Sequence, residues 1–173
     1  NAVKIATVFL DCVASEFIAK AKDISGLEKA VRFTEKARAI GIGACGFHTY
    51  LQQNSTPWES FDAHLWNLDV FNKIKIDSDE MTRTLAQETG EPEWCKGLGV
   101  RNASLRAIAP TKSTALIMGG ISEGINPDPA MIYNQSTAAG EMDRINPVIF
   151  KLMKERGVYN KREINKVIDD FGS

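Results

Sequence analysis

The chain has 173 residues, 21 basic and 22 acidic side chains, and 43% hydrophobic residues, which suffices for one domain with a sizeable core. The near balance of scattered charges gives no electrostatic case for nucleic acid or a membrane surface as a partner. No apolar run is long enough to span a membrane, no secretory signal opens the chain, and three widely spaced cysteines indicate neither a disulfide framework nor a zinc site. We therefore expect a reducing, cytoplasmic location.

The chain opens with two predicted helices. The first spans about residues 2–22, because apolar side chains recur every four residues along it. These side chains are Ile5, Phe9, Val13 and Phe17. Cys12 lies beside this stripe, so we expect a buried thiol that acts as a small hydrophobe. Ser25 and Glu28 have the spacing of a capping box, which predicts a second helix that ends near Gly41.

A glycine-rich segment follows, and residues 40–46 have the composition of a short buried strand. Gly41, Gly43 and Gly46 match the Gly-x-Gly-x-x-Gly spacing of dinucleotide-binding loops. That fingerprint follows a strand and precedes a second strand with an acidic residue. Here a helix comes first and no such acid follows, so the glycines predict close backbone packing. A Gly43→Val substitution is therefore expected to damage folding.

Two helices are predicted between this segment and the middle of the chain. The first contains Phe47–Leu51, and its His48 has no metal-ligand partner nearby, so we expect a histidine satisfied on the helix surface. Thr56-Pro57-Trp58-Glu59 is a second capping box, which predicts a long helix towards Gly90. The charged residues from Lys75 to Asp79 leave open whether this helix is continuous. Its expected core-facing side chains are Trp58, Phe61, Leu65, Leu68 and Phe71.

The next stretch has the residue types of an anion-binding loop. Leu105–Ile108 is a predicted strand, which Pro110 ends, and a short apolar helix closes at Gly119-Gly120. Three hydroxyls and one ammonium lie between them, at Thr111, Lys112, Ser113 and Thr114. Unpaired N–H groups at a helix start attract anions, and phosphate is the natural ligand. The alternative is that Ser113 or Thr114 merely caps the helix.

The last third of the chain contains a turn, an undecided segment and two helices. The prolines of residues 126–129 force the turn, and residues 131–142 are either irregular or a hairpin. Asn146-Pro147 begins a helix that Gly157 ends, and residues 160–163 cap a final helix. The expected inward side chains of that helix are Ile164, Val167, Ile168 and Phe171.

Three stretches together resemble the catalytic (large) subunit of aerobic class I ribonucleotide reductase. They are Ala109–Thr114 followed by Ile121–Pro127, Arg38–Phe47, and Gly99–Ser104, and the resemblance runs from about residue 27 to the end. It implies an α/β fold: a fragment of the ten-stranded α/β barrel, predominantly helical with a few short strands, as a single partial domain over residues 1–173. It also implies that the substrate diphosphate is bound by Pro110, Thr111, Lys112, Ser113 and Thr114.

The redox part of the family's site is missing from this sequence. The Asn-x-Cys-x-Glu loop and the radical-relaying tyrosine pair do not occur, and the context of Cys12, Cys45 and Cys95 matches no redox cysteine of the family. Cys45 stands where the family commonly has an apolar residue, and Asn126 replaces the acid of a Gly-Ile-Glu-Pro turn. We therefore expect no catalytic residue in this chain and no reductase activity from it alone.

The resemblance implies the remaining partners as well. They are the other parts of the large subunit, a ribonucleoside diphosphate substrate, and a radical-generating small subunit that carries a di-metal cofactor, with no cofactor or metal bound by this chain. The whole subunit would reduce the ribose 2′-hydroxyl to make DNA precursors. Two alternatives stay open: a fragment of a cobalamin-dependent reductase, and a helical structural or interaction module without a ligand.

Overall fold

The computed structural model describes residues 1–137 and 140–172. Their contacts form two compact units. Unit 1 comprises Asn1–Gly43 and Leu65–Ile108, and unit 2 comprises Ala44–His64 together with the described residues from Ala109 onwards. The predominantly helical character with few short strands is confirmed, whereas a single partial domain over residues 1–173 stays a prediction.

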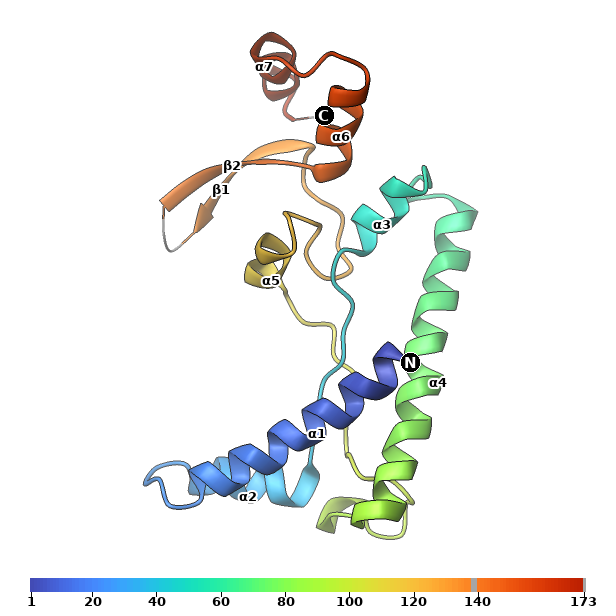
Figure 1. Ribbon diagram of the computed structural model, residues 1–173, viewed down its shortest axis with the longest axis vertical. Helices are drawn as coiled ribbons and strands as arrows, with labels where there is room; N and C mark the ends of the chain where they lie inside the picture. The colour runs from blue at the N-terminus through green and yellow to red at the C-terminus, as the bar shows by residue number, and fades with distance from the viewer. Residues whose placement is uncertain (138–139, 173) are drawn as a thin grey trace. The chain divides into compact units, whose positions relative to one another are not determined.

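Unit 1 is built from helices (Figure 1). Helix α1 spans Ala2–Ala21 and packs against α2, Glu28–Ala37, which in turn contacts the 3₁₀ turn η1, Glu93–Cys95. The predicted first helix is confirmed. The second ends earlier than predicted, because Arg38 adopts a left-handed conformation with φ 43°. Its capping box is also wrong: Leu27 is the N-cap residue, and the Glu28 carboxylate accepts a 3.0 Å hydrogen bond from the Gly26 N–H.

The apolar stripe of α1 does not face a core within the described residues. Ile5 and Phe9 are 67% and 65% exposed, and Cys12 is exposed too, so the expectation of a buried thiol is wrong. The buried side of α1 carries polar and small residues, namely Thr7, Asp11, Ala14 and Ala21. The helix is oriented by what its polar side chains bond, as described below, rather than by its largest apolar ones.

The long helix α4 spans Phe61–Thr89 and begins later than predicted. The Ser60 hydroxyl accepts the Ala63 N–H at 3.1 Å, so Ser60 supplies the cap that the capping box at Thr56 was expected to give. The charged stretch does not interrupt the helix, since Lys75 pairs with Asp79 one turn later at 3.1 Å. The expected core stripe is wrong in its first part, where four side chains are exposed: Trp58, Phe61, Leu65 and Leu68.

The two strands predicted in unit 1 are reduced to one parallel bridge between Ile42 and Arg106. The Ile40 N–H donates to the Ser104 carbonyl at 2.9 Å, and the Ala107 N–H donates to the Ile42 carbonyl at 3.2 Å. The segments therefore align side by side without a sheet. A Cβ added to Gly41 would lie 2.8 Å from the Ala107 Cβ, which confirms the expected close packing at this glycine. The prediction for Gly43 stays a prediction.

Unit 2 contains a hairpin and short helices (Figure 1). Strands β1, Ile132–Thr137, and β2, Gly140–Ile145, pair antiparallel with Ile132 opposite Ile145. The undecided segment is thus a hairpin. Helix α3 (Phe47–Gln53) packs against α6 (Pro147–Glu155), and α7 (Lys161–Asp169) packs against β1. The remaining helix, α5, spans Lys112–Ile117.

The caps of the last two helices confirm their predicted starts. The Asn146 side-chain oxygen accepts the Val148 N–H at 2.9 Å, and that of Asn160 accepts the Glu163 N–H at 3.1 Å. The expected inward face is wrong in part, however: Ile164 and Val167 are half-buried, but Ile168 is half-exposed and Phe171, beyond the end of α7, is 95% exposed. Local signals therefore set where these helices begin but not which side they bury.

Candidate functional site

The predicted anion-binding loop leads into α5 with its first amides unused. Thr111 is the N-cap residue, and no side chain caps the helix, so the alternative in which Ser113 or Thr114 is the cap is wrong. Among the described residues, the backbone N–H groups of Lys112, Ser113 and Thr114 form no hydrogen bond. Both hydroxyl residues are exposed. The first turn of α5 therefore offers a ligand five hydrogen-bond donors: three backbone amides and two side-chain hydroxyls.

The short length of α5 limits what its dipole contributes. The helix has 6 residues, so its summed peptide dipole is small beside that of a longer helix. Attraction for an anion at this place therefore depends on direct hydrogen bonds from the amides and hydroxyls, and on nearby charge.

Thr111 has a different role from the other two hydroxyl residues. Its Oγ1 accepts the Gly124 N–H at 2.8 Å and donates to the Cys45 sulfur at 3.1 Å. Both bonding directions of the hydroxyl are thus used within the protein. Thr111 holds the loop in place, which leaves Ser113 and Thr114 as the side chains that can meet a ligand.

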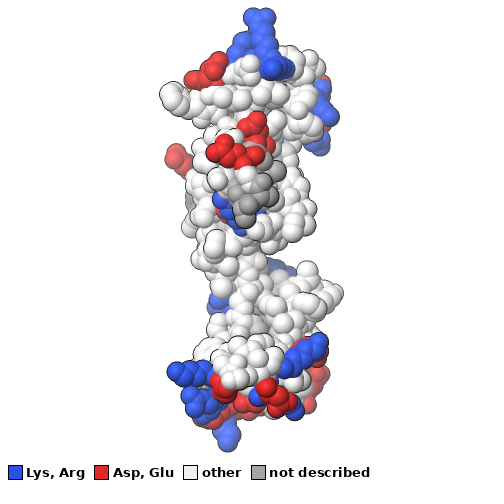
Figure 2. All heavy atoms as spheres, turned by 90° about the vertical axis from the view of Figure 1, so that its left-hand side faces the viewer, with Lys and Arg blue, Asp and Glu red and all other residues white. Residues whose placement is uncertain are grey.

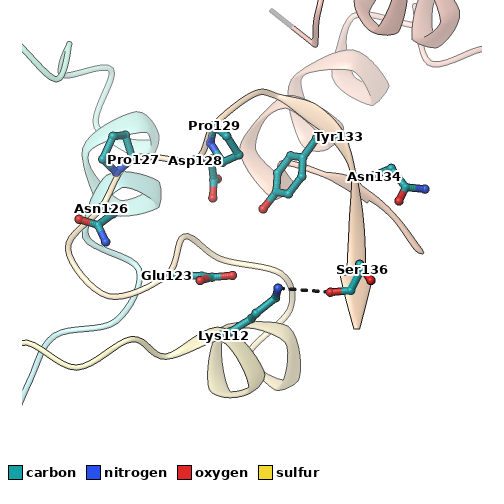
Figure 3. Close-up of a pocket in the computed structure, with 9 residues that line it drawn as sticks. All are labelled: Lys112, Glu123, Asn126, Pro127, Asp128, Pro129, Tyr133, Asn134 and Ser136. Carbon is teal, nitrogen blue, oxygen red and sulfur yellow. Dashed lines mark hydrogen bonds between the residues drawn. The ribbon is translucent and has the colours of Figure 1, made fainter. Parts of the chain in front are cut away.

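Lys112 faces a cavity of about 350 Å³ beside the hairpin (Figure 3). Its Nζ donates to the Ser136 carbonyl at 3.2 Å. Two carboxylates, those of Glu123 and Asp128, also line the cavity. The Arg144 guanidinium lies 3.9 Å from the Glu123 carboxylate. Because Arg144 pairs with Glu123 and Asp128 lies in the same cavity as Lys112, the charges at the cavity nearly cancel. The exposed start of α5, with its available amides and hydroxyls, is therefore the better place for a polyanion.

The segment after α5 is fixed to the start of α3. The Ser122 hydroxyl accepts the Thr49 N–H at 3.1 Å, and the Thr49 hydroxyl accepts the Ser122 N–H at 2.8 Å. Both residues are buried. Gly46 donates its N–H to the Ser122 carbonyl at 3.0 Å, has φ 82°, and has Ile121 so close that an added Cβ would lie 2.7 Å from its Cδ1. This glycine also packs as predicted.

His48 is satisfied within unit 2. Its Nδ1 accepts the Asp128 N–H at 3.1 Å, and its ring meets the Trp58 ring edge-on at 5.6 Å. Burial lowers the pKa of His48, and the negative charge of Asp128 partly opposes this. The histidine is thereby held neutral as an acceptor, which agrees with the structural role expected from the sequence.

Sequence reasoning missed a buried charged cluster in unit 1. The Asp11 carboxylate accepts hydrogen bonds from Arg38 Nε at 2.8 Å and from Asn102 Nδ2 at 3.0 Å. Asn102 Nδ2 also donates to the Arg38 carbonyl at 2.9 Å, and the Thr82 hydroxyl donates to Asn102 Oδ1 at 2.9 Å. Arg38 and Asn102 belong to two of the stretches that carry the resemblance, and this was the signal available in the sequence.

Surface charge, helix hydropathy and the grouping of metal-ligand residues give three further findings. Figure 2 shows acidic and basic side chains interspersed on the face in view. Among the described residues no helix has the length and apolar character needed to cross a bilayer. The same residues contain no group of three or more His, Cys, Asp or Glu side chains that would hold a metal ion.

Comparisons with known proteins match almost the whole chain. Residues 1–97 and 93–171 match the model of the ribonucleotide reductase barrel domain. The ribonucleoside-diphosphate reductase large subunit of Invertebrate iridescent virus 6 is 34% identical over 165 residues, which are 95% of this chain and 17% of the relative. The vitamin B12-dependent ribonucleoside-diphosphate reductase of Thermoplasma acidophilum is 30% identical over 174 residues, 95% of this chain and 22% of the relative.

A solved structure agrees with these relatives. The class Id ribonucleotide reductase alpha subunit of Actinobacillus ureae superposes with a TM-score of 0.88 at 37% identity, covering 99% of this chain and 31% of that one. The chain thus spans well under half the length of the proteins that it matches. It belongs to the ribonucleotide reductase barrel-domain family, as part of a large subunit.

Proposed function

We propose that this chain supplies the substrate-diphosphate loop of a ribonucleoside-diphosphate reductase. The observation that carries the proposal is the start of α5, where three backbone N–H groups that have no acceptor among the described residues adjoin the exposed hydroxyls of Ser113 and Thr114. A diphosphate presents several acceptor oxygens, each able to take charge-assisted hydrogen bonds from such donors. Family membership and the residue types of the loop support the same ligand.

Each loop residue has a stated part in this proposal. Pro110 fixes the backbone before the helix and removes an N–H that would otherwise compete. Thr111 ties the loop to Gly124. Lys112 supplies positive charge near the ligand, and Ser113 and Thr114 donate through their hydroxyls. Holding the diphosphate orients the ribose for reduction of its 2′-hydroxyl, so the loop contributes by positioning substrate rather than by acting on the reacting atoms.

In this proposal the redox chemistry is carried out by residues outside this chain. We place the catalytic cysteines in the remaining portion of the large subunit, and the radical on a cytoplasmic small subunit with a di-metal cofactor. Two observations fit a chain that packs against further barrel elements. The apolar side chains of α1 are exposed, and the segments at Ile42 and Arg106 form a single bridge rather than a sheet. Deoxynucleotide formation by the 173-residue chain alone would contradict this assignment.

A second candidate is a cobalamin-dependent reductase, which the similarity to the Thermoplasma acidophilum enzyme favours. The two differ in what restores activity to the complete large subunit. Turnover that requires the radical-generating small subunit supports the first candidate. Turnover with adenosylcobalamin and no small subunit supports the second, and in both cases the diphosphate loop keeps its role.

The loop is tested by a double substitution, Ser113→Ala with Thr114→Ala, in the complete large subunit. Each lost hydrogen bond is expected to weaken binding by about 0.5–1.5 kcal/mol, measured by calorimetric titration with a ribonucleoside diphosphate. Binding of the unphosphorylated nucleoside should not change. The matched control, Thr84→Ala with Ser104→Ala, removes two hydroxyls of unit 1. Unchanged diphosphate affinity of a folded double variant would favour a module without this ligand.

A further inference from the structure

A directed chain of hydrogen bonds connects three segments of unit 2 at the candidate loop. The Gly124 N–H donates to Thr111 Oγ1 at 2.8 Å, the Thr111 hydroxyl donates to Cys45 Sγ at 3.1 Å, and the Cys45 thiol donates to the Ser122 carbonyl at 3.8 Å. Each group donates to the next and accepts from the one before. The half-buried thiol of Cys45 is thereby the acceptor that sets the direction of the Thr111 hydroxyl.

We propose that Cys45 is a positioning residue for the diphosphate loop. Its sulfur orients the Thr111 hydroxyl, and through it fixes the backbone that presents the amides of Lys112, Ser113 and Thr114. The inference rests on the proposed function of that loop. It adds a residue whose side chain does not belong to the loop and does not meet the substrate.

The frame around Cys45 is rigid enough for this role. The next residue, Gly46, bonds the Ser122 carbonyl and packs against Ile121 with no room for a Cβ. Thr49 and Ser122 lock the same two segments together through a reciprocal pair of buried hydrogen bonds. The sulfur is therefore held by well-packed surroundings, whereas Thr111 lies at the start of an exposed turn. The position of the sulfur thus determines where the Thr111 hydroxyl points.

Thr111 is the point at which such an adjustment matters most. It is the N-cap residue of α5, so its carbonyl accepts the Ala115 N–H at 2.7 Å, and its own backbone directs the three amides that follow. An apolar side chain at position 45 would leave the Thr111 hydroxyl without its acceptor. The hydroxyl would then turn to another partner, and the hold on Gly124 and on the start of α5 would loosen.

The experiment compares Cys45→Val, Cys45→Ser and Thr111→Val in the complete large subunit, with CDP as the probe. Valine fills the space but accepts no hydrogen bond, so we expect a threefold to tenfold higher dissociation constant and KM for CDP, with kcat changed less than twofold. Serine keeps an acceptor and a donor and should recover most of the affinity. Cys12→Val, at the exposed thiol of α1, is the control and should bind as the parent does.

A double-mutant cycle separates positioning from simple destabilisation. If Cys45 acts through Thr111, the Cys45→Val, Thr111→Val double variant binds CDP no more weakly than the weaker single variant. Additive losses, a serine variant as weak as the valine variant, or parental affinity of Cys45→Val would each overturn the inference.

The same titration of the Ser113→Ala, Thr114→Ala variant shows which proposal has failed. If that variant binds weakly while Cys45→Val binds as the parent does, the loop is confirmed and only the role of Cys45 is wrong. If neither variant changes CDP affinity, the proposed site itself is wrong.

Discussion

The two units bury polar groups by different means. In unit 1 the buried centre is ionic: Asp11 and Arg38 are both about 94% buried and bonded to one another and to Asn102. In unit 2 the centre beside the loop is neutral, with the hydroxyls and amides of Thr49 and Ser122 paired reciprocally and Thr111 extending the network to the loop. The buried guanidinium of Arg144 in the same unit donates to the Gly120 and Ile121 carbonyls.

This difference separates what holds the scaffold from what holds the candidate site. A buried ion pair costs much to desolvate, and removing one member leaves an uncompensated charge. A neutral reciprocal pair costs less to break, but it fixes two backbone segments at short range. The unit with the ionic centre should therefore respond most strongly to a single substitution, and the unit with the neutral centre should respond through the loop it positions.

The largest expected effect is that of Asp11→Ala. It leaves the Arg38 guanidinium buried without its carboxylate and removes an acceptor from Asn102. Breaking one partner of a buried pair typically costs about 3–5 kcal/mol, measured as the free energy of unfolding of the complete large subunit in a denaturant titration. Asp23→Ala, which removes an exposed carboxylate, is the control. A cost under about 1 kcal/mol, typical of exposed pairs, would show that the cluster is not a structural centre.

A smaller loss is expected from Ser122→Ala in unit 2. The substitution removes the acceptor of the buried Thr49 N–H, and an unsatisfied buried donor costs about 1–3 kcal/mol. Region-resolved hydrogen exchange should show faster exchange at α3 and at the Gly124 amide, which bonds Thr111 Oγ1, with α1 and α2 unchanged. Faster exchange in unit 1 to the same extent would contradict the separation of the two networks. Ser136→Ala, at an exposed position of β1, is the matched control.

The sequence predicted best those features that depend on a few neighbouring residues. The asparagine caps of α6 and α7 lie within three residues of the amides they accept, so composition alone indicates them. The long helix α4 was likewise predicted, and its lysine–aspartate pairs at one-turn spacing explain why the charged stretch stays helical.

Features that depend on distant contacts were not predictable in the same way. Arg38 ends α2 early in a left-handed conformation while bonded to Asp11, 27 residues away. Thr111 is oriented by Cys45, 66 residues away. The exposed stripe of Ile5 and Phe9 has the periodicity of a buried face, and periodicity reports that a face is apolar without saying which polypeptide covers it.

The smallest expected effect is the difference in pH response between the units. Among the described residues, the carboxyl groups with a lowered pKa lie in unit 1: Asp11, Glu28, Asp77 and Asp79. Burial alone would raise the pKa of Asp11, but hydrogen bonds and charge from Arg38, with Arg101 and Asn102, lower it from its ordinary 3.8. Because their ordinary values are 3.8 and 4.5, these groups contribute full stability above pH 4.5 and lose it only as the pH falls further.

In unit 2 the corresponding group is His48. Burial lowers the pKa of this histidine from its ordinary value of 6.5. A base with a lowered pKa stabilises the fold fully above its ordinary value, and this contribution is lost as the pH falls from 6.5 towards the folded pKa. Protonation of Nδ1 also removes the acceptor of the Asp128 N–H. Between pH 6.5 and 4.5, therefore, free energies of opening from hydrogen exchange should fall at α3 and stay constant at α1. His48→Asn should abolish that fall, whereas His64→Asn, at an exposed histidine, should not. An equal fall in both units over this interval would contradict the assignment of the response to His48.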